Sequence, residues 1–178
     1  MCLALVLAMG IVGVGYAAWT DTIYIEGTVT TGSWDVGGTH GFWKNWQSHK
    51  TYTRSEIEGW LSNIDGSSSW LGPTTVEGMV ALIEAGEAEG HTKYDAFLMQ
   101  YLPTRLNAAS GRLILTTIRD YYPPYDPGDY LGLGGQGTLL EIITKIESKY
   151  PDLPDQDPTD DEFEIMKDIC DALNNLAI

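Results

Sequence analysis

Residues 92–111 read TKYDAFLMQYLPTRLNAASG, and this stretch shows the pattern that decides the fold class. Thr92 and Asp95 are spaced as a capping box, in which the threonine oxygen accepts a hydrogen bond from a free amide of the first helical turn. The acid also favours the positive end of the helix dipole. Apolar residues then recur at helical spacing: Phe97, Leu98, Tyr101 and Leu102. The stretch therefore predicts a helix that Pro103 should kink and Gly111 should end.

The same start signal occurs at four other places, each a threonine three residues before an acid with apolar residues at helical spacing behind it. These pairs are Thr53 with Glu56, Thr74 with Glu77, Thr138 with Glu141, and Thr159 with Glu162. The repetition predicts a compact domain of five to six short helices, and therefore a mainly α fold. In the expected architecture an N-terminal signal or anchor and one or two β-strands precede this domain.

Two segments between these starts are less regular. Arg112–Tyr122 contains a short apolar run that could form a buried strand, but Ile118 and Tyr122 continue a helical spacing, which favours a helix. Residues 123–137 (PPYDPGDYLGLGGQG) predict a loop, because adjacent prolines and several glycines do not hold regular structure.

The N-terminus predicts export. Met1 to Trp19 carries no charge, and Gly15 and Ala17 are the small residues expected before a signal cleavage site. No Lys or Arg precedes the run, so either the true start lies upstream or the chain begins inside its signal. A retained membrane anchor through residues 1–19 is the alternative to cleavage. We therefore expect a signal or anchor at 1–17 and a secreted or cell-surface protein.

Residues 18–38 predict an N-terminal strand segment. Its apolar residues Ile23 and Ile25 alternate with Tyr24 and Glu26, as in a half-buried strand. Gly37 and Gly38 then predict a hinge before a helical domain at 39–178.

Composition restricts the function further. Removing about 17 residues leaves roughly 160, enough for one domain with a real core. The chain has 10 Lys and Arg against 25 Asp and Glu, a net charge of −15, which argues against nucleic acid and anionic membranes as partners. Cleavage would remove Cys2 and leave Cys170 unpaired. A buried helical thiol is the favoured interpretation of Cys170, and an intermolecular bridge is the alternative.

Two segments suggest ligands. Trp43 and Trp46 lie close together and could form an exposed glycan platform, although packing of a strand-to-helix corner is favoured because aromatic residues dominate cores. The densest acidic run could hold calcium through Asp155, Asp157, Asp160 and Asp161. It departs from the EF-hand pattern, and a solvated loop leading into an acidic helix start also explains it. Asp120, Asp126 and Asp129 form a weaker candidate.

The sequence contains no pattern of catalytic residues. His40, His49 and His91 are its histidines, and none occurs in a zinc-binding motif or beside a nucleophile in a recognisable arrangement. We therefore expect a protein that is not an enzyme.

The segment WTDT at 19–22, followed by Gly27-x-Val29-x-Thr31-Gly32-x-Trp34-Asp35, resembles the mature N-terminus of the SipW-dependent secreted proteins, the group that includes camelysin and TasA. The resemblance implies export and subunits that polymerise when one N-terminal strand completes a neighbour's sheet. It implicates four residues: Trp19, Ile23, Ile25 and Val29. Too few strand-like segments follow Asp35 to build the β-sandwich of that family.

The segment THGFWKNW at 39–46 resembles the T-x-G-[YF]-W-K-[NT] signature of a secreted bacterial domain of unknown function. Three further segments match that domain in order: YTRSE at 52–56, RLNAASG at 105–111 and DALNN at 171–175. At 99–103 this chain has MQYLP in place of the domain's His-Gln-aliphatic-Ala-Ala run.

These observations predict an exported structural protein of the cell surface or extracellular matrix, which self-associates through residues 19–36. The alternative is a monomeric extracellular module that binds glycan or calcium through Trp43, Trp46 and the acidic loop.

Overall fold

The computed structural model describes residues 38–68, 71–113, 117–119, 129–134, 136–149, 157 and 161–175. They all belong to one compact unit, Ser33–Ile178. This part of the chain is mainly helical, as the sequence predicts, and its elements in chain order are α2 (His40–Lys44), α3 (Trp46–His49), α4 (Arg54–Asp65), α5 (Val76–Glu87), α6 (Lys93–Ala109), β1 (Thr117–Arg119), β2 (Gln136–Thr138), α7 (Leu139–Lys149) and α8 (Asp161–Asn174). The predicted signal and N-terminal strand lie outside the described residues.

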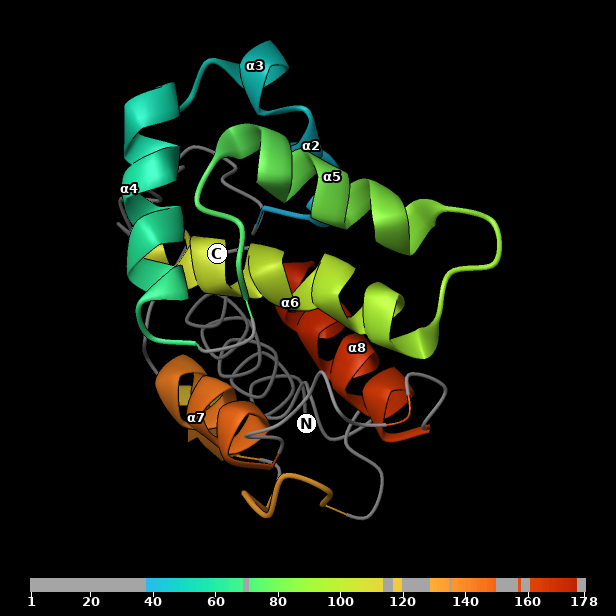
Figure 1. Cartoon of the computed structure of the whole chain (residues 1–178). Helices are drawn as coiled ribbons and strands as arrows, with labels where there is room; N and C mark the ends of the chain where they lie inside the picture. Colours follow the sequence, from blue (N-terminus) through green and yellow to red (C-terminus); the bar gives the residue numbers. More distant parts are fainter. Residues whose placement is uncertain are drawn as a thin grey trace, which may run out of the picture. The chain divides into compact units, whose positions relative to one another are not determined.

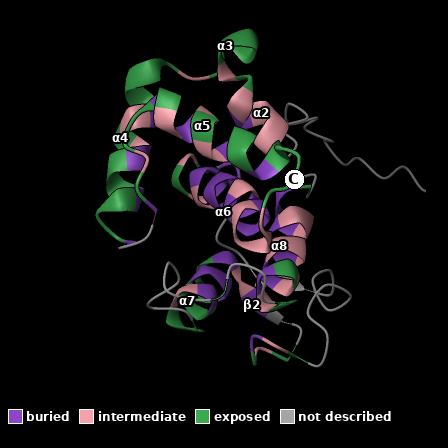
Figure 2. Ribbon diagram, turned by 45° about the vertical axis from the view of Figure 1, so that its right-hand side comes forward, coloured by how far each residue is buried: buried purple, intermediate pink, exposed green. Residues whose placement is uncertain are grey.

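Helix α6 is the central element (Figures 1 and 2). It packs most extensively against α8 and α5, and it also contacts α4 and α2. Nearly every side chain from Ala96 to Asn107 is buried. The helix continues through the buried Pro103 and ends at Ala109, and Gly111 follows the cap with a φ of +74°. Gly111 therefore ends the helix as predicted, since glycine adopts a left-handed backbone without a steric penalty.

Three predicted starts are confirmed by their capping hydrogen bonds. The Thr53–Glu56 and Thr92–Asp95 boxes are complete in both directions. Thr138 and Glu141 exchange the same pair of bonds at 2.7 and 3.1 Å. Helix α8 begins at Asp161, two residues after Thr159, and Thr159 itself is not among the described residues.

The predicted cap of α5 is wrong by one residue. Thr75, rather than Thr74, accepts the hydrogen bond from Gly78 and caps the helix. Two threonines in succession make both registers possible locally, and the observed register buries Val76, Met79 and Ile83 on one face. Near the end of α5, Gly86 lies so close to α6 that a Cβ there would be 2.5 Å from the Cβ of Met99.

The helix expected at Arg112–Tyr122 is also wrong, because residues 117–119 form β1. This strand pairs antiparallel with β2, and Ile118 lies opposite Gly137. Thr117 and Ile118 are β-branched, which favours a strand, and the pairing partner lies outside any local sequence window. The loop expected at 123–137 is therefore also wrong at its C-terminal end, since Gln136 and Gly137 belong to β2.

The aromatic segment after Gly38 forms two short helices, α2 and α3, that the sequence analysis does not anticipate. Thr39 caps α2 by accepting a hydrogen bond from the amide of Phe42. Trp43 is fully buried and is the largest side chain of the hydrophobic core. Its ring stacks on Tyr52 at a centroid distance of 5.8 Å, and Trp60 packs against both rings.

Candidate functional site

Three segments far apart in the sequence meet at the side chain of Asn107. Its Oδ1 accepts hydrogen bonds from the Gly38 amide at 2.9 Å and from the Trp43 indole nitrogen at 3.0 Å. Its Nδ2 donates to the Gly38 carbonyl at 2.9 Å and to Asn174 Oδ1 at 3.0 Å. Asn107 and Asn174 are both fully buried. These hydrogen bonds join the start of the described chain, helix α6 and the end of helix α8 into one buried polar network.

Of the predicted hinge at Gly37 and Gly38, only Gly38 lies among the described residues. Gly38 is buried, and both of its backbone polar groups are bound by Asn107. A Cβ at this position would lie 2.5 Å from Trp43 Nε1 and 2.7 Å from Asn107 Oδ1. Only glycine can pack this closely against these two side chains, and its backbone is held by the two hydrogen bonds to Asn107. Gly37 lies outside the described residues.

The network continues from Asn174 to the next polar side chains of α6. Asn174 Nδ2 donates to the Gln100 carbonyl at 2.8 Å and to Gln100 Oε1 at 3.2 Å. The Thr104 hydroxyl lies 3.0 Å from both the Gln100 carbonyl and Asn174 Oδ1. Gln100, Thr104 and Asn107 are spaced i, i+4, i+7, so they share one face of α6. That spacing is the signal that could have identified the network in the sequence.

The direction of these bonds favours one arrangement of the hydrogen bond between Gln100 and His40. Since Gln100 Oε1 accepts from Asn174, Gln100 Nε2 is the donor to His40 Nδ1, 3.1 Å away. The other ring nitrogen, Nε2, lies 3.7 Å from Glu87 Oε1. Glu87 also holds Lys44 at 2.5 Å, and this hydrogen bond raises the pKa of Lys44. The network thus connects the buried asparagines to an ionic cluster at the surface.

Cys170 lies beside this network and is fully buried. Burial raises the pKa of its thiol to about 12, although a hydrogen bond with Thr104 opposes the shift. The favoured interpretation of Cys170 as a buried helical thiol is confirmed. A thiol that stays protonated and inaccessible is a poor nucleophile.

A second polar cluster lies between α6 and α7. Arg105 forms an ion pair with Glu147, and its side chain is only 11 % exposed. The hydroxyls of Ser68 and Tyr101 donate to the same carboxylate oxygen at 2.6 and 2.9 Å. Burial raises the pKa of Tyr101 well above its usual value, so this hydroxyl remains a donor. The cluster fixes α7 to α6, since an ion pair shielded from water is stabilised when further hydrogen bonds satisfy it.

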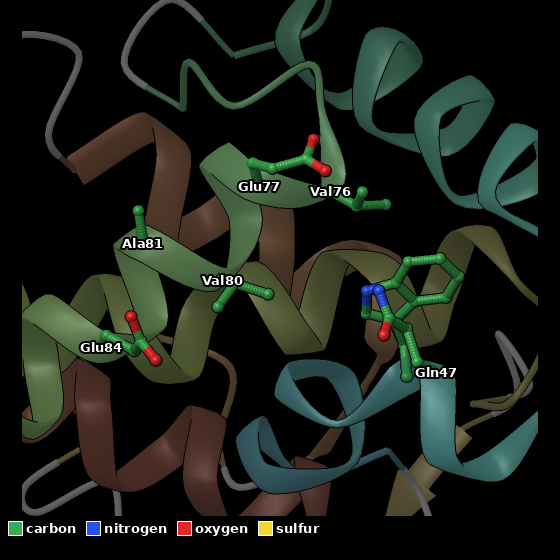
Figure 3. Close-up of a pocket in the computed structure, with 7 residues that line it drawn as sticks. Gln47, Val76, Glu77, Val80, Ala81 and Glu84 are labelled. Carbon is green, nitrogen blue, oxygen red and sulfur yellow. The ribbon is translucent and has the colours of Figure 1, made fainter.

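The two tryptophans considered for a glycan platform, Trp43 and Trp46, differ in how far they are buried. Trp43 is buried and belongs to the core, which confirms the packing interpretation for this residue. Trp46 is half-buried and lines an open pocket of about 300 Å³ between α3 and α5 (Figure 3). An exposed surface that includes both rings is therefore not formed.

The predicted calcium ligands do not form a site within the described residues. Asp161 lies in the first turn of α8 and pairs with Lys93 of α6, and Asp157 is exposed. Asp155 and Asp160 fall outside the described residues, as do Asp120 and Asp126 of the weaker candidate. Asp129 accepts hydrogen bonds from the amides of Leu133 and Gly134 in its own turn. In the part of the chain that the structure describes, no group of three or more His, Cys, Asp or Glu could hold a metal ion.

The assembly residues Trp19, Ile23, Ile25 and Val29 also lie outside the described residues. Among the helices that are described, none combines the length and hydrophobicity needed to cross a membrane. No protein-family model, no curated protein and no solved structure matches this chain.

Proposed function

We propose that this protein is an exported structural subunit of the cell surface or extracellular matrix. In this proposal residues 39–178 are the folded body, and residues 19–36 are the strand through which subunits associate. The apolar N-terminus, the resemblance of residues 19–35 to strand-exchanging secreted proteins, and the net charge of −15 support it. The strand would add to an open sheet edge of a second copy, where backbone hydrogen bonds supply the affinity.

The observation that carries the proposal is the attachment of the chain at Gly38. A strand that binds a neighbouring subunit is joined to its own body through the residues that follow the strand. Gly38 lies two residues after the predicted strand, and Asn107 binds both its amide and its carbonyl inside the body. The same asparagine binds the Trp43 indole, which is part of the core. This attachment gives the body a defined backbone position at Gly38, the first residue that the structure describes after the proposed strand.

Deletion of the strand tests the proposal. We would compare residues 18–178 with residues 37–178 by light scattering after size-exclusion chromatography and by negative-stain electron microscopy, in millimolar Ca²⁺ and in chelator. Oligomers or filaments of the longer chain, and monomers of the shorter chain with unchanged helical circular dichroism, support it. Loss of the assemblies in chelator would show that calcium is a structural ion.

Substitutions within the strand provide the matched control. Ile23→Asp with Ile25→Asp places charges on the apolar face of the strand and should abolish assembly. Tyr24→Asp alters the opposite face and should weaken it less. Monomers of residues 18–178 in every condition, or oligomers that survive the deletion, contradict strand-based assembly.

A further inference from the structure

An open pocket of about 300 Å³ lies between α3 and α5, at the low end of the roughly 300–1,000 Å³ typical of small-molecule sites. Its lining residues come from these two helices: Trp46, Gln47, Val76, Glu77, Val80, Ala81 and Glu84. The assembly proposal does not involve this pocket.

The α5 wall has a simple arrangement. Glu77, Val80, Ala81 and Glu84 are spaced i, i+3, i+4, i+7 and so share one face of the helix. Figure 3 shows Val80 and Ala81 between the two glutamates, with Gln47 across the pocket on α3. The wall is therefore apolar in its middle and has a carboxylate at each end.

Trp46 supplies an aromatic surface opposite α5. It packs against the hydrophobic core and is only half-buried, so part of its side chain remains accessible. The face of an indole ring carries negative electrostatic potential and attracts cations more strongly than other aromatic side chains do.

The carboxylates of the pocket are not fully neutralised by the protein. A hydrogen bond from Arg54 lowers the pKa of Glu77, which keeps this carboxylate ionised, but Arg54 also pairs with Glu58 at 3.0 Å. Lys44 Nζ lies 3.8 Å from Glu84 and only 2.5 Å from Glu87, so its stronger interaction is with Glu87. Glu84 is 55 % exposed at its side chain and can accept another partner.

The polar side chains of the pocket are mostly hydrogen-bond acceptors, which favours a ligand that supplies donors. Ionised carboxylates only accept hydrogen bonds, and Gln47 is the single lining side chain with N–H donors apart from the Trp46 indole. A saccharide brings acceptor oxygens as well as hydroxyls and would leave most of those oxygens without a protein donor. An ammonium or guanidinium group brings donors and positive charge together.

We propose that this pocket binds an organic cation with an alkyl chain, an alkylammonium or alkylguanidinium group. The cation pairs with the Glu84 carboxylate at one end of the α5 wall, the alkyl chain lies on Val80 and Ala81, and Trp46 lines the pocket from α3. Two sources carry this chemistry: a free amine, or the side chain of a Lys or Arg in a peptide.

The test is an NMR titration of the full-length chain in a non-ionic detergent without sugar headgroups. The probes are cadaverine and the peptides acetyl-Gly-Lys-Gly-amide, acetyl-Gly-Arg-Gly-amide and acetyl-Gly-norleucine-Gly-amide, with chitotriose as the saccharide. We expect the backbone amides of Val80 and Glu84 to shift with a Kd of about 1 mM for the cations and not for norleucine or chitotriose. Binding by cadaverine alone identifies a free amine, and binding by the peptides identifies a side chain.

Two variants separate the pocket from general attraction to an acidic protein. Ala81→Trp fills the pocket at an exposed position without changing the charge, and should weaken binding at least about tenfold. Glu84→Gln should weaken it about fivefold. Ala109→Trp, exposed at the end of α6, is the control and should bind as the unmodified chain does.

Several outcomes would overturn the proposal. They are equal binding of the norleucine peptide, preferential binding of chitotriose, no shift up to about 20 mM probe, or unchanged cation binding by a folded Ala81→Trp chain. Circular dichroism of each variant verifies the fold.

Discussion

The side chain of Asn107 binds both backbone polar groups of Gly38, accepting from its amide and donating to its carbonyl, each at 2.9 Å. The two residues are 69 positions apart, so this pair closes most of the described body into one loop. Asn107 also accepts from Trp43 and donates to Asn174, so every hydrogen-bonding position of its amide group is used.

Replacement of Asn107 by alanine should be strongly destabilising. Asn107→Ala leaves the Gly38 amide and carbonyl and the Trp43 indole N–H buried without this partner. Each such group costs about 1–3 kcal/mol, so we expect the free energy of unfolding in urea to fall by at least about 3 kcal/mol. Asn63→Ala, on the exposed face of α4, is the control and should change it by less than about 0.5 kcal/mol. A loss below about 1 kcal/mol for Asn107→Ala would show that the network contributes little.

Glycine at position 38 should be required for a steric reason. In Gly38→Ala the new methyl group meets Trp43 Nε1 at 2.5 Å and Asn107 Oδ1 at 2.7 Å, and overpacking of this kind costs about 1–3 kcal/mol. Gly41→Ala is the matched control, because its Cβ would lie 3.8 Å from Thr39 Oγ1, an ordinary contact, and alanine favours the helix. Thermal unfolding should therefore show a lower Tm for the first variant and an equal or higher Tm for the second. Equal changes of Tm for the two substitutions would contradict the steric requirement for glycine at position 38.

The capping boxes should make the stability of the folded protein decrease at acidic pH. Hydrogen bonds from Thr53 and Thr138 lower the pKa values of Glu56 and Glu141 in the folded protein. Their contribution is therefore complete above the unfolded-state value of about 4.3 and is lost as the pH falls through the folded-state values. Glutamine keeps the acceptor oxygen but does not titrate. The double variant Glu56→Gln, Glu141→Gln should consequently show a shallower fall of Tm between about pH 5 and pH 2.

The control for that measurement is Glu89→Gln, in the turn between α5 and α6 and outside the capping boxes. It should reproduce the acid dependence of the unmodified chain. If the double variant is as sensitive to acid as this control, the two boxes do not account for acid destabilisation.

Cys170 should be unreactive until the protein unfolds. Burial raises the pKa of its thiol to about 12, so at pH 8 the group is protonated as well as inaccessible. Residues 18–178 contain this cysteine alone, and we expect no colour with Ellman's reagent in buffer and one equivalent in concentrated urea. Rapid reaction of the native chain, or a disulfide-linked dimer on a non-reducing gel, would support the intermolecular alternative.

Local sequence signals predicted much of the helical architecture. The capping boxes at Thr53, Thr92 and Thr138 and the stop at Gly111 are confirmed, because each depends on contacts within a few residues. The predictions were wrong at two places where neighbouring residues allow more than one local structure. Thr75, and not the predicted Thr74, caps α5. The segment around Ile118 is a strand rather than the predicted helix, because it pairs with β2.

The sequence by itself determined that this chain is acidic, mainly helical and built from short capped helices, since composition and helix starts are local properties. Only the tertiary structure decided that Asn107 binds Gly38 and that Gln100 binds His40, and that Trp43 belongs to the core while Trp46 lines a pocket. Hydrogen bonds and burial between distant segments depend on how the helices pack, and no single segment contains that information.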